Sequence, residues 1–230
     1  MVKIDTHGPN IKISKESFSR GAPENDVNIV LPSGSESFRK VAVMPEINAE
    51  TLKRVLNKLG PFPQDKAVHL EGSDFIEVGP VEYVQTQATY KGQMKNGLRH
   101  GRGTQVWADG SKYEGEWRDD KTNGYGRLIH SDGDVYEGEW TSDTACGIGK
   151  YYHSQGAIYE GQWENDYQQG KGKETWPDGT YYEGDYHKGK KEGKGKFFWV
   201  DGSYYFGEFK DNNINGRGRL NFDNRKILLE

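Results

Sequence analysis

Aromatic residues and glycines recur from residue 90 onward at a spacing of 23 residues, with no insertion or deletion. Each unit opens with a tyrosine, and a glycine follows two positions later. A glycine pair and a closing glycine complete each unit, although Arg225 stands at the closing position of the sixth. This fixed period predicts a repeat architecture in which every unit contacts its neighbours. The opening tyrosines are Tyr90, Tyr113, Tyr136, Tyr159, Tyr182 and Tyr205.

Each unit contains two short candidate strands. The first has the pattern Tyr-x-Gly-x-aromatic, as in Tyr113 to Trp117, and the second follows the glycine pair, as in Gly126 to His130. An Asp-Gly pair such as Asp132-Gly133 then precedes the next unit, which predicts a hairpin turn. Such a turn has either a two-residue loop or a three-residue loop with a left-handed glycine.

Charge patterning favours the three-residue loop, because only that register sets basic residues opposite acidic ones. Each such cross-strand pair contributes about 0.2 to 1 kcal/mol. The pairs are Arg127 with Glu137, Lys150 with Glu160, Lys173 with Glu183, Arg102 with Glu116, Lys171 with Asp185, and Lys194 with Glu208. The register also sets Trp117, Trp140, Trp163 and Tyr186 opposite glycines, and we expect the missing side chains to let those rings lie over the backbone.

These patterns predict an all-β fold: an elongated, single-layer antiparallel sheet of six hairpins over residues 90–230, with repeats that start at 90, 113, 136, 159, 182 and 205. One face would carry aromatic rings and the other the charge pairs. Asp120, Asp143, Asp166 and Asn212 replace a turn glycine, and these residue types tolerate a left-handed turn.

The chain before the repeats divides into three predicted segments. Residues 1–47 are expected to be an extended arm, either a disordered tail or a segment ordered by a partner. Residues 48–60 predict a helix with Asn48 as its N-cap and a docking stripe of Leu52, Val55, Leu56 and Leu59, which would face either the repeats or a partner. Residues 61–89 form a connector that ends in a predicted capping strand, Val81 to Thr89.

Composition narrows the class of protein. The net charge of −4 argues against a dedicated nucleic-acid binder. Cys146 is the single cysteine, which is typical of a reducing compartment. Because no apolar run is long enough to span a bilayer and the first ten residues lack the apolar core of a signal peptide, we expect a soluble intracellular protein.

No constellation of residues indicates catalysis, and we expect neither a cofactor nor a metal site. His130 and His153 occupy one repeat position and could neighbour each other, yet tryptophans fill that position in other units, which favours a structural ring. The strings around Lys171 and Lys194 lack the Gly-Lys-Ser/Thr ending of a phosphate loop. An enzyme is therefore the least favoured class.

Two surfaces are candidates for binding. The first is the aromatic face, which a single-layer sheet would leave exposed unless cross-strand rings, the helix or a partner covered it; its residues are Tyr113, Trp117, Tyr136, Trp140, Tyr159, Trp163, Tyr182 and Tyr186. The second is a basic cluster that would contact anionic lipid or the acidic tail of a cytoskeletal polymer, unless it is only a solvated turn. The cluster consists of Lys188, Lys190, Lys191, Lys194 and Lys196.

The string from Tyr113 to Trp117, followed by Gly124-Tyr125-Gly126 and Asp132-Gly133, resembles the membrane occupation and recognition nexus (MORN) repeat. All six units match in register, while residues 1–89 do not. The resemblance implies a non-catalytic scaffold that binds proteins, either in a larger assembly or as a second copy of this chain. The setting it implies is cytoskeletal, with the axoneme of the cilium or flagellum as the most specific expectation. The alternative is a peripheral module that binds anionic phospholipids through the basic cluster.

Overall fold

The computed structural model of the protein describes residues 38–41, 43–44, 50–63, 66 and 74–222. They belong to two compact units, residues 14–144 and residues 145–230, which we call the N-terminal and C-terminal units. Residues 1–37, which make up most of the predicted arm, lie outside the described residues.

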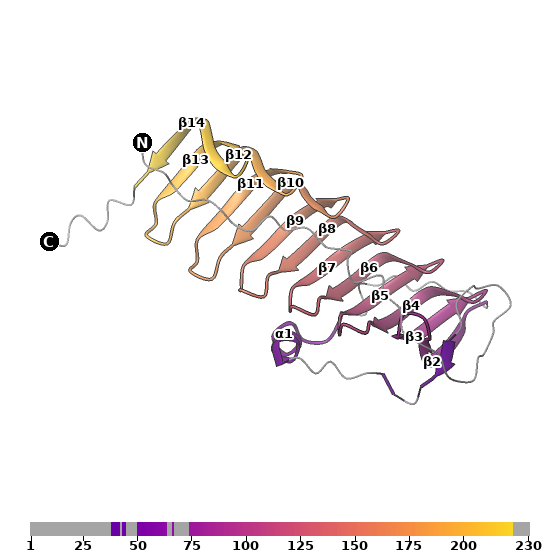
Figure 1. Cartoon of the computed structure of the whole chain (residues 1–230). Helices are drawn as coiled ribbons and strands as arrows, with labels where there is room; N and C mark the ends of the chain where they lie inside the picture. The colour runs from indigo at the N-terminus through magenta and orange to yellow at the C-terminus, as the bar shows by residue number, and fades with distance from the viewer. Residues whose placement is uncertain (1–37, 42, 45–49, 64–65, 67–73, 223–230) are drawn as a thin grey trace. The chain divides into compact units, whose positions relative to one another are not determined.

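Antiparallel strands build both units, and within each unit a strand pairs with its neighbours in sequence (Figure 1). The N-terminal unit contains β1 (Phe38–Lys40), α1 (Glu50–Leu59), β2 (Ile76–Tyr83), β3 (Ala88–Lys95), β4 (Leu98–Val106), β5 (Lys112–Arg118), β6 (Lys121–Ile129) and β7 (Val135–Thr141). The C-terminal unit contains β8 (Thr144–Tyr152), which begins at the boundary, β9 (Ile158–Glu164), β10 (Tyr167–Thr175), β11 (Tyr181–His187), β12 (Lys190–Phe198), β13 (Tyr204–Lys210) and β14 (Asn213–Asn221). The predicted all-β sheet of six hairpins with one short helix is confirmed.

The strand register agrees with the prediction at every charge pair. Arg127 lies opposite Glu137, Lys173 opposite Glu183, and the other four predicted pairs are also cross-strand partners. Trp117 lies opposite Gly101 and Tyr186 opposite Gly170. The three-residue loop is therefore the correct one.

Two kinds of turn join the strands. Between repeats, the amide of His130 donates to the carbonyl of Asp134 at 2.9 Å, and Gly133 in the loop has a φ of 94°. Within a repeat, the turn has two residues that are both left-handed, as at Asp119 and Asp120 with φ of 49° and 65°. Such a turn matches the right-handed twist of its strands, and aspartate fills it as predicted.

The capping strand differs from its prediction. β2 ends at Tyr83, and residues 84–87 form a turn in which Gln87 has a φ of 54° and donates its amide to the carbonyl of Tyr83. Ala88 and Thr89 instead begin β3, with which β2 pairs. The prediction counted the β-branched residues here as strand residues. Thr86 instead stabilises the turn, because its hydroxyl accepts the amide of Ala88.

Helix α1 confirms the predicted helix over most of its length. Val55, Leu56 and Leu59 are half-buried, whereas the side chain of Leu52 and the proposed cap Asn48 lie outside the description. The helix ends where Gly60 adopts a φ of 72° and donates its amide to the carbonyl of Leu56. The chain that follows this stop contacts the repeats, as described below.

Candidate functional site

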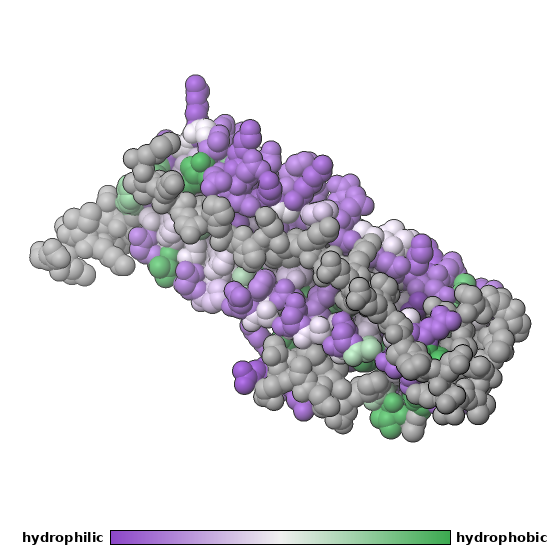
Figure 2. Space-filling model, viewed as in Figure 1, coloured by the Kyte–Doolittle hydropathy of each residue, from purple (hydrophilic) through white to green (hydrophobic). Residues whose placement is uncertain are grey.

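The eight residues of the expected aromatic face are all buried. Each is at most 4% exposed, so the expectation of an exposed aromatic surface is wrong for these residues. Hydrophilic side chains dominate the described surface visible in Figure 2. Of the three ways in which the rings could be covered, packing by neighbouring rings applies.

Tyr113, Tyr159 and Tyr182 each pack edge-on against the ring at the fifth position of their own repeat and against that of the next. Tyr113 lies 5.1 Å from Trp117 and 5.6 Å from Trp140 between ring centroids, and Tyr182 lies 5.4 Å from Tyr186 and 4.8 Å from Phe209. Such edge-to-face pairs stabilise by about 0.5 to 1.5 kcal/mol beyond their buried area. We call these rings the aromatic ladder; within each unit they form the core.

The tyrosine hydroxyls of the ladder have structural partners. Tyr113 donates to the carbonyl of Glu116 at 3.0 Å, and Tyr182 donates to that of Asp185 at 3.0 Å. Burial raises the pKa of Tyr113 and of Tyr186 well above the ordinary value for tyrosine. These phenols stay neutral at physiological pH, and their role is to hold the strand ends.

The side chains that lie over the glycine pairs are a tyrosine ring and a carboxylate, not the expected tryptophans. A Cβ on Gly126 would collide with the ring of Tyr113, so the second glycine of the pair is covered by the opening tyrosine and not by a tryptophan. A Cβ on Gly124, whose φ is 64°, would collide with the carboxylate of Glu116, which accepts the amide of Tyr125 at 2.8 Å. The register was predicted correctly, but the reason for the first glycine is this carboxylate.

The predicted basic cluster does not form one surface. Lys191 is 2% exposed, and its Nζ lies 2.7 Å from Oε2 of Glu174, which is equally buried. Lys190 forms an ion pair with Asp211 at 2.6 Å, while Lys188 and Lys194 are exposed. Lys191 is therefore a core residue, because its side chain fills space among Trp176, Tyr182 and Tyr186.

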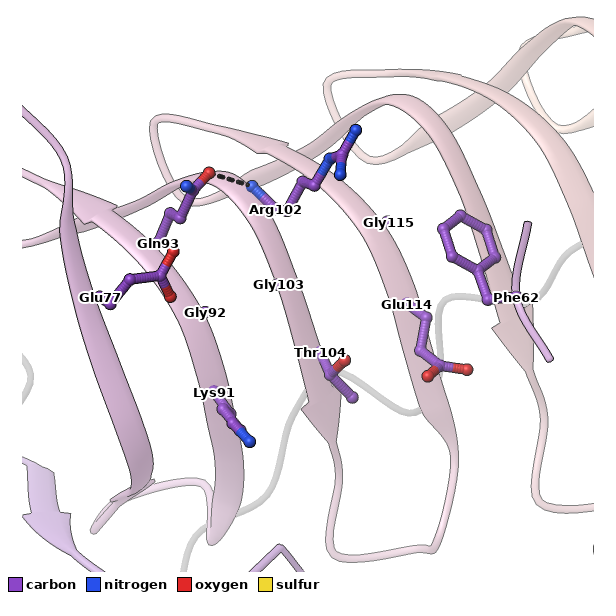
Figure 3. A pocket seen from close by; sticks show the side chains of 10 residues that line it. All are labelled: Phe62, Glu77, Lys91, Gly92, Gln93, Arg102, Gly103, Thr104, Glu114 and Gly115. Atoms are coloured by element: carbon purple, nitrogen blue, oxygen red, sulfur yellow. Dashed lines mark hydrogen bonds between the residues drawn. The ribbon is translucent and has the colours of Figure 1, made fainter. Parts of the chain in front are cut away.

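The charged face of the N-terminal unit contains an open groove of about 480 Å³. Figure 3 shows two rows of side chains with glycines between them, Gln93 and Arg102 in one row and Lys91, Thr104 and Glu114 in the other. Phe62, from the connector after α1, lines one end. A residue of the connector thus closes one end of this groove.

Three kinds of contact, to a backbone carbonyl, between rings and to a lysine side chain, hold the connector on the sheet beside this groove. Arg127 donates to the carbonyl of Gly60 at 2.9 Å, and its guanidinium carbon lies 5.8 Å from the ring centroid of Phe62. The rings of Phe62 and Tyr125 stack with centroids 6.0 Å apart. Lys66 donates to the hydroxyl of Tyr125 at 3.2 Å. The helix region therefore attaches to the repeats, and sequence analysis missed this site, although the Gly-Pro-Phe-Pro string after the helix was visible.

A second open groove, of about 750 Å³, lies on the charged face of the C-terminal unit. Four lysines and two glutamates line it, together with Phe206, which is 56% exposed. Two of these lysines, Lys194 and Lys196, belong to the predicted basic cluster. The lysines are Lys171, Lys173, Lys194 and Lys196, and the glutamates are Glu160 and Glu183.

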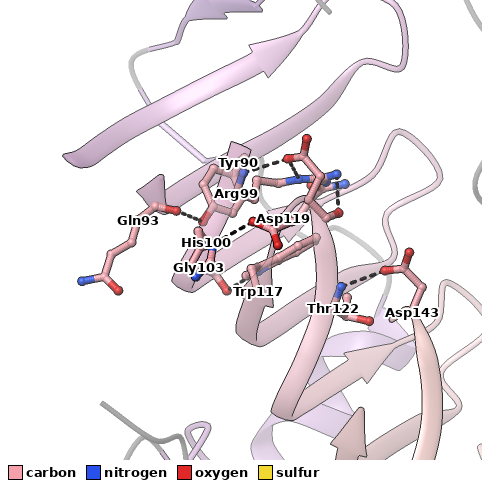
Figure 4. A network of polar contacts seen from close by, with 11 residues as sticks. Tyr90, Gln93, Arg99, His100, Gly103, Trp117, Asp119, Thr122 and Asp143 are labelled. Carbon is pink, nitrogen blue, oxygen red and sulfur yellow. Dashed lines mark hydrogen bonds and ion pairs between the residues drawn. The ribbon is translucent and has the colours of Figure 1, made fainter. Parts of the chain in front are cut away.

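Polar contacts between successive repeats fix the turns. The carboxylate of Asp143 accepts the amide of Thr122 at 2.7 Å, and the amide of Asp143 donates to the carbonyl of Thr122 at 3.1 Å (Figure 4). Arg99 makes the equivalent contacts with Asp120 and stacks 4.4 Å over the ring of Trp117. A left-handed aspartate therefore both fits the turn and accepts a backbone amide of the neighbouring repeat, whereas a glycine has no side chain to accept it.

The described residues were also compared with the patterns of a metal site and of a membrane-spanning helix. Burial lowers the pKa of His130, whose ring packs in the structural position favoured by the sequence. The described part of the chain holds no group of three or more His, Cys, Asp or Glu side chains arranged for a metal ion. None of its helices combines the length and apolarity needed to cross a membrane.

The MORN repeat model matches six consecutive segments of the chain, residues 90–112, 113–135, 136–158, 159–181, 182–204 and 205–225. The chain belongs to the MORN repeat family. Tyr-x-Gly-x-aromatic strands, glycine pairs and left-handed turns are thus the structural form of the MORN unit in this protein. MORN repeats suggest a protein that binds other proteins or membranes, and MORN proteins are generally non-catalytic scaffolds.

Comparison with other proteins adds two distant structural similarities. The TCP domain of SAS-4 (dCPAP) from Drosophila melanogaster, in complex with a proline-rich motif of Ana2 (dSTIL), is 16% identical with a TM-score of 0.32, over 46% of this chain and 58% of that chain. The TCP10 domain of CPAP from Danio rerio, in complex with a STIL peptide, is 11% identical with a TM-score of 0.28, over 61% of this chain and 72% of that chain. Similarity at this level carries no conclusion about the function of the MORN protein. No curated protein matches the sequence.

Proposed function

We propose that this MORN repeat protein is a non-catalytic scaffold that binds other proteins through the charged face of its sheet. The observation that carries the proposal is the connector on Tyr125 and Arg127, where the repeat surface already holds a segment of polypeptide outside the repeats. The aromatic ladder supports binding indirectly, because its buried rings hold the strands at the spacing that fixes the charged rows.

The setting we propose is a cytoplasmic cytoskeletal assembly, with the axoneme of a cilium or flagellum as its most specific form. The family resemblance supports this placement. Regular rows of charge at a fixed spacing are also suited to an elongated partner, since each repeat offers the same contact again.

Detergent fractionation of ciliated cells that express the tagged full chain tests both parts of this function. We expect retention in the insoluble cytoskeletal fraction, release by salt because the contacts are ionic, and microscopic localisation along the axoneme. Release with soluble proteins, without any crosslinked partner, would contradict the scaffold. Retention on a cytoskeletal structure outside cilia would contradict only the axonemal placement.

The alternative function is binding to anionic membranes, which the groove lysines favour. The connector on the charged face of the N-terminal unit instead favours a protein ligand for this kind of surface. Flotation of the full chain with vesicles of phosphatidylcholine, with and without phosphatidylserine, distinguishes the two. The scaffold predicts no phosphatidylserine-dependent flotation, and light scattering of the same protein shows whether a second copy of the chain is the partner.

A further inference from the structure

The two grooves are the same surface at different places in the repeat series. The C-terminal groove lies three 23-residue repeats after the N-terminal groove in the sequence. Gly103 and Gly115 therefore correspond to Gly172 and Gly184. The positions of Tyr125, Arg127 and Glu137, which hold the connector, correspond to Lys194, Lys196 and Phe206. The three contacts of the connector can therefore be examined one by one in the C-terminal unit.

The contact that Arg127 makes with a backbone carbonyl has a possible counterpart at Lys196 in the C-terminal groove. Arg127 donates to the carbonyl of Gly60, and Lys196 also offers a cationic donor at its place on the sheet. The Nζ of Lys196 lies 4.3 Å from the ring centroid of Tyr204 and 5.8 Å from that of Phe198, contacts that leave an ammonium proton available, because two ring faces do not satisfy three donors. This position can therefore bind a main-chain carbonyl in both grooves.

Both grooves place an aromatic ring beside a cation, although the ring comes from a different repeat position in each. In the N-terminal groove, Phe62 stacks on Tyr125 beside the cation of Arg127. In the C-terminal groove, the exposed ring of Phe206 lies opposite Lys196 across the strands. A ring bound there would contact both an aromatic face and a cation, which attract it as in the N-terminal groove.

The two grooves differ in the charge that they favour in the bound segment after its aromatic residue. Lys66 donates to the Tyr125 hydroxyl and lies 4.0 Å from a carboxylate oxygen of Glu137. The corresponding positions in the C-terminal groove are Lys194 and Phe206, which provide no acceptor and one additional cation. Lys171 is paired with Asp185 at 2.5 Å, and the other three lysines outnumber the two glutamates of this groove, so it favours a carboxylate where the N-terminal groove accepts a lysine.

We propose that the C-terminal groove binds a short segment of another protein in which an aromatic residue is followed by carboxylate side chains. This inference rests on the proposed scaffold function and specifies its partner. A polypeptide is favoured over a membrane because the connector, a polypeptide segment, lies on the equivalent residues Tyr125 and Arg127 of the N-terminal unit.

Fluorescence anisotropy with the full chain and two matched peptides tests the proposal. The acidic probe is a labelled peptide with the sequence of residues 58–66 in which Gln64 and Lys66 are replaced by glutamate, and the control is the unmodified sequence. We expect the acidic probe to bind at least several-fold more tightly. Replacing Phe62 by alanine in the acidic probe should weaken it further. Equal affinity for both probes, or no binding of either, would overturn the proposal.

Variants of the full chain locate the site. Lys194→Gln with Lys196→Gln should weaken the acidic probe by roughly three- to tenfold, because two exposed ionic contacts are lost. Lys53→Gln with Lys58→Gln removes the same charge from the exposed face of α1 and should leave affinity unchanged. Circular dichroism confirms that each variant retains its β-sheet. Equal effects of the two double variants would show only non-specific attraction and would refute the groove.

A reciprocal variant provides a gain of function. Phe206→Glu restores the acidic residue that Glu137 supplies in the N-terminal groove, so it should weaken the acidic probe and strengthen the unmodified peptide. Failure to shift this preference would contradict the correspondence between the grooves. If the lysine variant abolishes flotation with phosphatidylserine vesicles and leaves peptide binding unchanged, the groove binds membranes and the proposal is wrong. If cytoskeletal retention survives the lysine variant and neither peptide binds, the scaffold stands and this partner class does not.

Discussion

Strands β5 and β11 occupy equivalent places in the two units, yet different chemistry surrounds them. β5 carries Trp117, and its neighbours at the ladder are Gln105 and Thr122. β11 carries the smaller Tyr186, and the corresponding neighbours are Glu174 and Lys191. One repeat pattern therefore accommodates either an indole beside Gln105, Thr122 and the guanidinium of Arg99, or a phenol beside the buried ion pair of Lys191 and Glu174.

The size of the central ring explains the difference. Trp117 fills its site, and its indole N–H donates to the carbonyl of Gly103 at 3.3 Å. At Tyr186 the side chain of Lys191 fills the remaining space, and its charge requires Glu174, whose carboxylate also accepts the hydroxyl of Tyr186 at 3.2 Å. The repeat pattern thus specifies a packed volume, while the polarity of the filling groups is free to vary.

The largest expected effect comes from removing the indole itself. Trp117→Ala should destabilise the protein by about 4 kcal/mol, because it leaves a cavity between Tyr90 and Tyr113. Urea unfolding followed by circular dichroism measures the change. The control is Trp199→Ala, a half-buried turn position, for which we expect about 1 kcal/mol. Similar losses for both would mean that the ladder is not the core.

The sequence was sufficient to predict what depends on neighbouring repeats. Arg127 and Glu137 are ten positions apart in one hairpin, so charge complementarity alone determined their register. The left-handed Asp143 was also predictable, because the turn needs only local residues. Fold class, hairpin order and loop length all followed from such short-range constraints.

What the sequence could not predict depends on distance and burial. Phe62 and Tyr125 are far apart in the chain, and no period connects them. Lys191 was grouped with surface lysines because a sequence gives no view of the space beside Tyr186. The carboxylate of Glu116 over Gly124 depends on one side-chain conformation, which a pattern of residue types does not contain.

The second prediction breaks the ion pair at β11. Lys191→Met should cost about 3 kcal/mol, because it keeps the side-chain volume but leaves Glu174 buried without its cation. The double variant Glu174→Gln with Lys191→Met removes both charges and still fills the space beside Tyr186, so we expect it to recover most of that stability. Chemical denaturation of the single and double variants gives the coupling energy between the two sites. Additive losses would show that the pair does not act as a unit.

The smallest effect concerns the turns, where the two units again differ. Asp143 supplies a side-chain acceptor to Thr122, whereas Gly189 at the equivalent turn makes only the backbone contact with Gln168, at 2.9 Å. Asp143→Gly retains the left-handed turn and removes one charged hydrogen bond, so we expect a loss of about 1 kcal/mol. Asp143→Ala should lose about 1 kcal/mol more, because alanine disfavours the φ of 65°. The reverse change, Gly189→Asn, should raise the urea midpoint slightly by adding an acceptor. A lower midpoint for that variant would mean that the acceptor cannot reach the neighbouring strand in the C-terminal unit.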